Sequence, residues 1–388
     1  MQQLALFAEI TATKDLPTVA LTPELSEALA LNVPVAIGVS GGKDSTVAAW
    51  ATINYLNQIG HTGERILIHS DLGRVEWKDS LPICEKLAMH LNTELVVVRR
   101  KSGDMVDRWL QRWNDNVIRY QELSCVKLIL PWSTPSMRFC TSEMKTSIIW
   151  RYLKKRWPTD TVLSVTGIRR QESTNRAKQP VAKPKLAKKD SDVVWGMDWH
   201  SVIDWKVSDV WNCHDLNDLP RHEAYTTYGS SRVSCAFCVL ASKPDLWSSS
   251  TCADNADLYR ELVDLEVQST FSFQSNQWLA DINPKLLSEA TLNGLAQAKK
   301  AAEVRELAES RIPQHLHFKK GWPECMPTQA EAKLLASVRN TVASATGLTI
   351  DCTDADSIRE RYADLLTRKG EGHKIDEVNE LADTILFQ

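Results

Sequence analysis

The residues best suited to chemistry lie in one short stretch, where an apolar run ends in Ser-Gly-Gly-Lys-Asp-Ser over Ser40–Ser45. An amphipathic pattern follows at once, which predicts a strand, a loop and a helix. Two glycines let the backbone turn sharply and present several N–H groups to one anion. The helix adds its positive N-terminal dipole, so the loop should bind phosphate. The groups expected to contact it belong to Ser40, Gly41, Gly42, Lys43, Ser45 and Thr46.

The spacing differs from that of the Walker loop. That loop has four residues between its first glycine and Gly-Lys, and Ser or Thr follows the lysine. Here Gly38 is too close to Gly42, and Asp44 follows Lys43. The alternative interpretation is an ordinary glycine turn between a strand and a helix.

The composition is that of a soluble globular protein of one or two domains: 388 residues, 43% hydrophobic and 24% charged. There is no 18-residue apolar run and no signal-peptide pattern, so we expect a cytoplasmic protein without a membrane partner. Nine cysteines at irregular spacing do not indicate a disulfide framework. Most of them are expected to be small buried hydrophobic residues.

Strand and helix patterns alternate along the first half of the chain, which predicts an α/β fold with a doubly wound parallel sheet. The expected strands are 35–39, 65–69, 94–98 and 161–166. Ligands of such sheets bind at the carboxyl ends of the strands, so the loops after Val39, His69 and Thr166 should share one rim. Helical patterns dominate the rest, and we expect domains at 1–250 and 251–388, the second a helical C-terminal subdomain.

A strongly basic stretch runs from Arg169 to Lys189, where only Glu172 opposes eight Lys or Arg residues. Its part from Lys178 to Asp190 contains two prolines and little apolar content, which predicts a mobile surface loop. Such a stretch suits a nucleic-acid backbone near the phosphate loop. The alternatives are a solvated loop without a partner and a docking site for an acidic protein surface.

The phosphate loop and five further boxes resemble the PAPS-reductase-like branch of the PP-loop ATP pyrophosphatases, over roughly residues 33–245. The boxes follow in the family's order: His69–Gly73, Arg138–Lys145, Gly167–Ser173, Ile203–Trp211 and Ser234–Val239. The resemblance implies an adenine nucleotide α-hydrolase-like fold and cleavage of ATP between its α- and β-phosphates. It also implies that Gly167 belongs to a nucleotide-binding loop.

The residue types assign roles within this site. Mg²⁺ bound mainly by phosphates needs one carboxylate, for which Asp44 is the first candidate and Asp71 the second. Arg169 and Arg170 can clamp phosphate, with Glu172 orienting them. For Asp44 the alternative is a partner of the helix dipole, and for the arginines it is surface solvation.

Cys140, Cys235 and Cys238 leave three interpretations open. They could ligate an iron–sulfur cluster or zinc, relay sulfur as persulfides, or be structural. A cluster needs four ligands. Cluster-bearing reductases of the resembling family carry Cys-Cys where this chain has Phe139-Cys140, so Cys125, Cys213 or Cys252 would have to supply the fourth.

Among the resembling family, the chain is most like the ATP pyrophosphatase of DNA phosphorothioation systems (DndC-like or SspD-like). This implies adenylylation of a nucleic-acid oxygen, release of pyrophosphate and displacement of AMP by sulfur. The implied partners are a cysteine desulfurase, DNA and other subunits of a modification complex. The alternatives are a PAPS reductase, which the lack of a cysteine after Cys352 disfavours, the small subunit of ATP sulfurylase, and a non-catalytic nucleotide-binding module of a defence complex.

Overall fold

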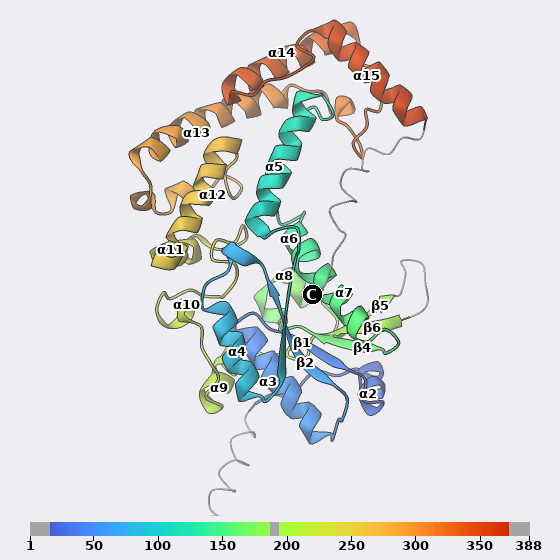
Figure 1. The fold of residues 1–388 in the computed structure, drawn as a ribbon, viewed down its shortest axis with the longest axis vertical. Helices are drawn as coiled ribbons and strands as arrows, with labels where there is room; N and C mark the ends of the chain where they lie inside the picture. Colours follow the sequence, from blue (N-terminus) through green and yellow to red (C-terminus); the bar gives the residue numbers. More distant parts are fainter. Residues whose placement is uncertain (1–15, 187–193, 372–388) are drawn as a thin grey trace, which may run out of the picture. The chain divides into compact units, whose positions relative to one another are not determined.

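The chain divides into two compact units in this computed structural model, which describes residues 16–186 and 194–371. Unit 1 comprises Met1–Arg100 and Phe139–Asp254, and unit 2 comprises Lys101–Arg138 and Asn255–Gln388 (Figure 1). The division between Asp254 and Asn255 lies close to the expected boundary at residue 250. Lys101–Arg138, however, packs with the helical unit, although it lies within the first domain expected from the sequence.

Unit 1 is built on a six-stranded sheet whose neighbouring strands are parallel, except for the last pair. Across the sheet the order is β3 (Glu94–Arg99), β2 (Arg65–Asp71), β1 (Val35–Gly38), β4 (Val162–Val165), β6 (Val194–Trp199) and β5 (Ala182–Leu186). The expected α/β fold with a mainly parallel sheet is therefore confirmed.

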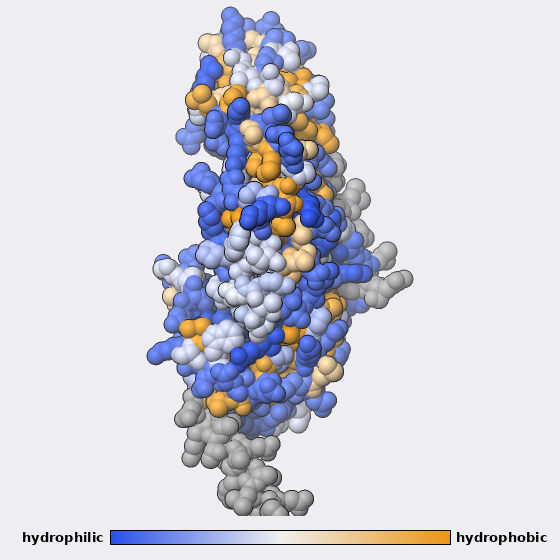
Figure 2. Space-filling view, turned by 90° about the vertical axis from the view of Figure 1, so that its left-hand side faces the viewer, coloured by the Kyte–Doolittle hydropathy of each residue, from blue (hydrophilic) through white to orange (hydrophobic). Residues whose placement is uncertain are grey.

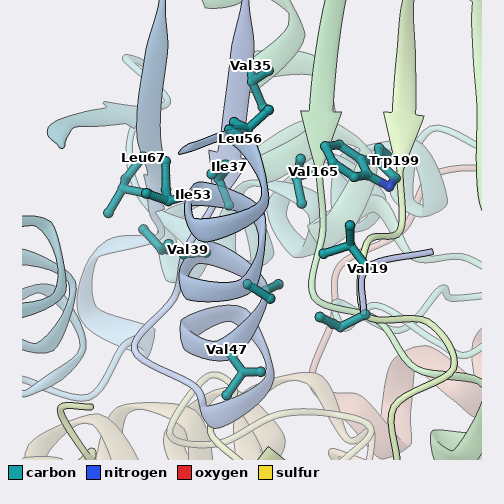
Figure 3. Close-up of a cluster of buried hydrophobic side chains, with 14 of the residues drawn as sticks. Val19, Val35, Ile37, Val39, Val47, Ile53, Leu56, Leu67, Val165 and Trp199 are labelled. Atoms are coloured by element: carbon teal, nitrogen blue, oxygen red, sulfur yellow. The ribbon is translucent and has the colours of Figure 1, made fainter. Parts of the chain in front are cut away.

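Alternate residues of the central strands face opposite sides of the sheet, as the strand geometry requires. Val35 and Ile37 pack into the larger core, whereas Ala36 packs into the smaller one. The larger core is covered by α2 (Pro23–Ala30), α3 (Lys43–Gln58), α4 (Ser80–His90) and α9 (Val207–Leu216). Figure 3 shows Ile53 and Leu56 of α3 beside Ile37 and Leu67. The smaller core is covered by α7 (Ser147–Arg156).

The position of β1 determines where a ligand can bind. β1 lies between β2 and β4, so the chain moves to one side of β1 first and returns to the other side later. This is the topological switch point at which open α/β sheets bind ligands. The loop after β1 and the loops after β2 and β4 therefore open at one rim, as expected.

The basic stretch contains a strand, which corrects the expectation of a mobile surface loop over Lys178–Asp190. Residues Ala182–Leu186 form edge strand β5, which pairs antiparallel with β6. An edge strand tolerates Pro184 because one side of its backbone needs no ladder partner, and lysines on an edge discourage further pairing. Lys188 and Lys189 lie outside the described residues.

Unit 2 is helical, as expected for the C-terminal subdomain, and its main helices are α5 (Met105–Gln121), α12 (Ala256–Ser269), α13 (Glu289–Ser310), α14 (Gln329–Thr346) and α15 (Ala355–Gly370). Trp109 and Trp113 of α5 are buried and pack edge-on against Phe273 and Phe271, respectively. These aromatic contacts join Lys101–Arg138 to the C-terminal helices.

The remaining elements are short. They are the helices α6 (Phe139–Thr141), α8 (Thr174–Ala177), α10 (Glu223–Thr226) and α11 (Lys243–Thr251), the π-helical turn Ser142–Thr146, and 3-10 turns at Gly73–Val75, Arg170–Glu172, Ala253–Asn255, Leu279–Asp281, Pro284–Leu286 and Gln314–Leu316. The face drawn in Figure 2 is mostly hydrophilic, with hydrophobic side chains in small groups. Among the described residues, no helix is long and apolar enough to span a membrane.

Candidate nucleotide site

The backbone of the loop after β1 has the shape expected of a phosphate cradle. Gly41 adopts a positive φ of 71°, and Gly42 is the N-cap of α3. A Cβ on Gly41 would lie 3.0 Å from the Ser80 carbonyl oxygen and 3.1 Å from the His222 ring, so the position requires glycine. The first turn of α3 begins at this end of the loop, and the N-terminal end of a helix favours an anion.

The hydroxyl of Ser45 closes the loop. It accepts a hydrogen bond from the Ser40 N–H (3.2 Å) and donates to the Gly42 carbonyl oxygen (2.9 Å). Thr46 is buried, and its hydroxyl lacks a hydrogen-bond partner among the described residues. A phosphate oxygen in the loop could accept a hydrogen bond from this hydroxyl, so the residues present fit a phosphate group.

Three charged side chains meet behind the loop. The Asp44 carboxylate lies 3.2 Å from Lys43 Nζ and 2.6 Å from Arg169 Nε. Lys43 and Arg169 are only 6% and 4% exposed, so each cation needs this carboxylate as a counter-charge. In the described structure, Asp44 therefore serves both cations, and its predicted role toward Mg²⁺ would use the same two oxygens.

The two predicted arginines lie differently. Arg169 donates through Nη1 to Gln171 Oε1 (3.1 Å) and the Trp205 carbonyl oxygen (3.4 Å), so its guanidinium is held inside the site. Arg170 instead pairs with Asp204 at the surface. The structure thus brings Arg169, and not Arg170, to the phosphate loop.

Gly167 allows the loop after β4 to reach the phosphate loop. A Cβ at this position would lie 2.5 Å from the Asp44 carbonyl oxygen and 2.8 Å from the Ser45 Cα. Only glycine permits this approach, which places Arg169 beside Asp44.

Asp71, the second candidate for a Mg²⁺ ligand, lies at the end of β2. One of its carboxylate oxygens accepts a hydrogen bond from the Gly73 N–H (2.7 Å) and so stabilises the turn that follows the strand.

The residue pattern of the box His69–Gly73 predicts no role for His69. Its ring is buried, with Nδ1 3.0 Å from the Val39 carbonyl oxygen and Nε2 3.0 Å from Glu76 Oε2. Both partners only accept, so the ring must be the imidazolium. Burial opposes this charge, but the hydrogen bonds to Cys84 and Glu76 outweigh burial and raise the pKa of His69 to about 10. The ring therefore places a fixed positive charge next to the start of the loop.

A segment distant in the sequence encloses the loop. His214 Nε2 lies 3.1 Å from the Lys43 carbonyl oxygen, and the Tyr225 hydroxyl accepts from the Lys43 N–H (3.1 Å). Lys43 Nζ donates to the Ser231 carbonyl oxygen (3.2 Å). No spacing rule singles out these residues, because only the fold brings α9 and α10 beside α3.

The three candidate cysteines are partly exposed and belong to one region. The Ala236 N–H donates to the Val75 carbonyl oxygen (2.7 Å), which fixes Cys235 beside the end of the second box. Burial raises the pKa of Cys235; Lys145 opposes this rise, and the charges of Cys238, Glu76 and Cys140 add to it. Cys140 and Cys238 are thus near enough to influence the Cys235 thiol.

The cysteines do not form a prepared metal site. Within the described ranges, no group of three or more His, Cys, Asp or Glu side chains is placed to hold a metal ion. Cys213, one candidate for the fourth ligand, belongs to α9 and is fully buried in the larger core, and Cys252 is also buried. Cys125 belongs to unit 2.

The structure describes six of the eight cations in the basic stretch, and four of these six have acidic partners. These pairs are Arg169–Asp44, Arg170–Asp204, Arg176–Glu172 and Lys185–Asp198. Lys178 and Lys183 are exposed. Strand β5 runs antiparallel to β6, and Lys185 lies opposite Gly196 of β6. Gly196 in turn pairs with Val162, at the amino end of β4, which is the end away from the phosphate loop. The strand therefore leads away from the rim that carries the phosphate loop.

The model of the phosphoadenosine phosphosulfate (PAPS) reductase domain matches residues 34–241, more than half of the chain. The chain belongs to the PAPS reductase domain family. The matched residues include the phosphate loop, the loop after β4 and the cysteine segment. The match includes Lys101–Arg138 of unit 2 but ends before the C-terminal part of that unit, which begins at Asn255.

Individual relatives of this PAPS reductase-domain protein are distant. An uncharacterized protein of Methanocaldococcus jannaschii is 27% identical over 210 residues, which are 54% of this chain and 42% of that protein. The chain thus spans less than half the length of this curated relative.

Two solved structures are also similar. The PAPS reductase of Candida auris, in a phosphate complex, has a TM-score of 0.33 and 13% identity, covering 56% of this chain and 98% of its own. The U34-tRNA thiolase NcsA of Methanococcus maripaludis, with its [4Fe-4S] cluster, has a TM-score of 0.35 and 15% identity, covering 78% of this chain and 81% of its own.

We predict that Gly167→Ala weakens ATP binding strongly, because the added Cβ must push the backbone of Asp44 and Ser45 out of position. Calorimetric titration with ATP measures the change, which should be at least tenfold in Kd. Gly370→Ala is the matched control, since a Cβ there meets nothing within 4 Å. Equal ATP affinity in both variants would contradict the assigned role of Gly167.

A second prediction concerns pH and the buried ring of His222. Its Nδ1 accepts from the Ala224 N–H (3.0 Å), so the neutral ring carries its proton on Nε2 beside Ser80 Oγ (3.2 Å). Burial lowers the pKa of His222 from 6.5 to about 4, and the nearby Asp79 only partly opposes this. Because the unfolded chain then binds more protons, the free energy of unfolding should fall as the pH drops from 6.5 through 4.

The loss due to His222 is on the order of 3 kcal/mol at full protonation. Denaturant unfolding at a series of pH values, compared with His222→Gln, isolates this contribution, because the variant should lose part of the slope. His90→Gln, at an exposed position of α4, is the control. A wild-type profile with the same slope as that of His222→Gln would show that His222 does not titrate in this way.

Proposed function

We propose that this PAPS reductase-domain protein is an ATP pyrophosphatase that activates a nucleic-acid oxygen by adenylylation for sulfur incorporation. The observation that carries the proposal is the phosphate loop Ser40–Ser45 at the switch point of the sheet, with Lys43 and Arg169 on either side of Asp44. We further propose backbone phosphorothioation of DNA as the reaction that uses this activation, as in the DndC-like and SspD-like proteins that the sequence resembles.

Different groups of the loop would have different roles in binding ATP. The N–H groups at the start of α3 would bind the β- and γ-phosphates, and Lys43 would add its charge. Asp44 would hold Mg²⁺, which neutralises phosphate charge when bound. The α-phosphorus is then left at the open rim. A nucleic-acid oxygen attacks it, the bond to the bridging oxygen of the β-phosphate breaks, and pyrophosphate leaves.

Sulfur would enter in the second step. A persulfide supplied by a cysteine desulfurase has a terminal sulfur that can attack the activated centre. The bond to the adenylylated oxygen then breaks, and AMP leaves with that oxygen. The transferred sulfur is now bonded to phosphorus and still joined to the carrier sulfur. A second thiol attacks the carrier sulfur, forms a disulfide with it and releases the phosphorothioate, and an external dithiol reductant restores both thiols. Cys235 and Cys238, with Cys140 nearby, are the candidates for carrier and second thiol.

Reduction of PAPS to sulfite is the second candidate function, because the family match itself favours it. The same rim would bind the phosphates of PAPS rather than those of ATP. The two functions separate by substrate: a reductase releases sulfite from PAPS with a thiol donor, whereas a pyrophosphatase releases pyrophosphate from ATP.

We predict that the purified protein converts ATP to AMP and pyrophosphate, and that Asp44→Ala and Ser45→Ala abolish this release. Ser45→Ala should do so with little loss of folding, whereas Asp44→Ala should also lower the free energy of unfolding. Asp44→Ala leaves two buried cations without their counter-charge, and Ser45→Ala opens the loop. Chromatography of labelled nucleotides identifies the products, with Ser26→Ala on the exposed side of α2 as the control. ADP with phosphate as the products, or full turnover in both variants, would exclude the proposed reaction.

For the nucleic-acid partner we predict that Lys178→Glu with Lys183→Glu lowers DNA affinity and reduces the salt slope by roughly two, since each phosphate contact releases counterions. Lys300→Glu with Lys333→Glu changes the net charge equally at exposed positions of unit 2 and serves as the control. Fluorescence anisotropy over a salt series measures both quantities. If only desulfurase association is lost, the stretch is a protein-docking site instead.

A further inference from the structure

We propose that Tyr225 is a positioning residue that couples occupation of the phosphate loop to the placement of the cysteine segment, here Ser231–Cys238. The inference rests on the proposed binding of nucleotide at the loop, and it adds a link between that loop and the thiols. Tyr225 lies in α10, far in sequence from both elements that it joins.

The Tyr225 hydroxyl bridges the two elements. It accepts from the Lys43 N–H of the phosphate loop (3.1 Å) and from the Val233 N–H of the cysteine segment (3.0 Å). A phenol oxygen has room for both donors and still keeps its own proton to donate. The bridge therefore ties the first residue of α3 to a residue two positions before Cys235.

Lys43 makes a second tie to the same segment. Its Nζ donates to the Ser231 carbonyl oxygen (3.2 Å) and lies 5.3 Å from the centre of the Tyr225 ring. At the other side, Asp245 accepts from the Ser231 N–H (2.8 Å) and hydroxyl (3.0 Å). The start of the cysteine segment is thus anchored at Ser231, and the Tyr225 bridge holds Val233, between that anchor and the Ala236–Val75 hydrogen bond.

A phosphate group needs the same two groups of Lys43. Its oxygens are strong acceptors, and the N–H at the first position of a helix and a lysine ammonium are the donors that bind them. Phosphate binding therefore competes with Tyr225 for the Lys43 N–H and with Ser231 for Nζ. Gly42, the residue before Lys43, faces the same two groups, since a Cβ built on it would be in ordinary van der Waals contact with Val233 Cβ (3.6 Å) and the Tyr225 hydroxyl (3.7 Å). Binding and segment position are consequently linked in both directions.

The test measures alkylation of individual cysteines in the full chain by iodoacetamide and peptide mass spectrometry, with and without ATP or inorganic pyrophosphate. In the wild type, saturating ligand should accelerate alkylation of Cys235 and Cys238 at least threefold. Cys325 and Cys352, in unit 2, serve as internal references whose rates should stay constant.

Tyr225→Phe keeps the ring and removes only the bridging oxygen. Its Cys235 and Cys238 should react faster without ligand, near the liganded wild-type rate, and ligand should change these rates less than twofold. Tyr55→Phe removes a hydroxyl from half-buried Tyr55 of α3 and should behave as the wild type. Circular dichroism checks that each variant is folded.

Two results would overturn the inference while leaving the proposed function intact. One is ligand binding, seen by calorimetry, without any change in the wild-type alkylation rates. The other is Tyr225→Phe with wild-type rates and a wild-type response to ligand. If neither ATP nor pyrophosphate binds, the proposed function fails, and the coupling fails with it.

Discussion

The arrangement of the site depends on one carboxylate held between two buried cations. Lys43 and Arg169 are nearly excluded from water, and a buried charge without a counter-charge would destabilise the fold by several kcal/mol. Asp44 satisfies both, and it thereby connects the phosphate loop to the loop after β4. Gly167 makes this connection sterically possible, since no side chain fits between the two backbones. A ligand that binds there must replace hydrogen bonds and ion pairs that the loop already makes within the protein.

Residues from the second half of the chain enclose the phosphate loop. The backbone N–H, backbone carbonyl and side chain of Lys43 all contact residues between His214 and Ser231. The cysteine segment follows directly and is joined to the end of the second box through Val75 and Ala236. The phosphate loop and the cysteine segment are thus neighbours in one unit, which suits the proposed reaction, because activation and sulfur delivery would take place side by side.

The fixed charge of His69 adds to this arrangement. Its two acceptor partners, the Val39 carbonyl oxygen and the Glu76 carboxylate, leave the imidazolium as the form that satisfies both. The ring lies at the junction of β1 and the loop, so its charge and Lys43 act on the same region. The basic stretch contributes less than its composition indicates, because four of its cations are already paired with carboxylates.

The sequence by itself determined the elements whose signals are local. Gly41 is needed for a positive φ, and the apolar periods of residues 35–39 and 45–59 set β1 and α3, so the strand, loop and helix were all predictable. Tertiary structure decided the rest. Edge strand β5 has a loop-like composition because an edge is where Lys and Pro are tolerated. Trp109 and Trp113 join unit 2 through Phe271 and Phe273, and Tyr225 reaches Lys43 across 182 residues. Such contacts depend on which surfaces meet after folding, and no spacing along the chain encodes them.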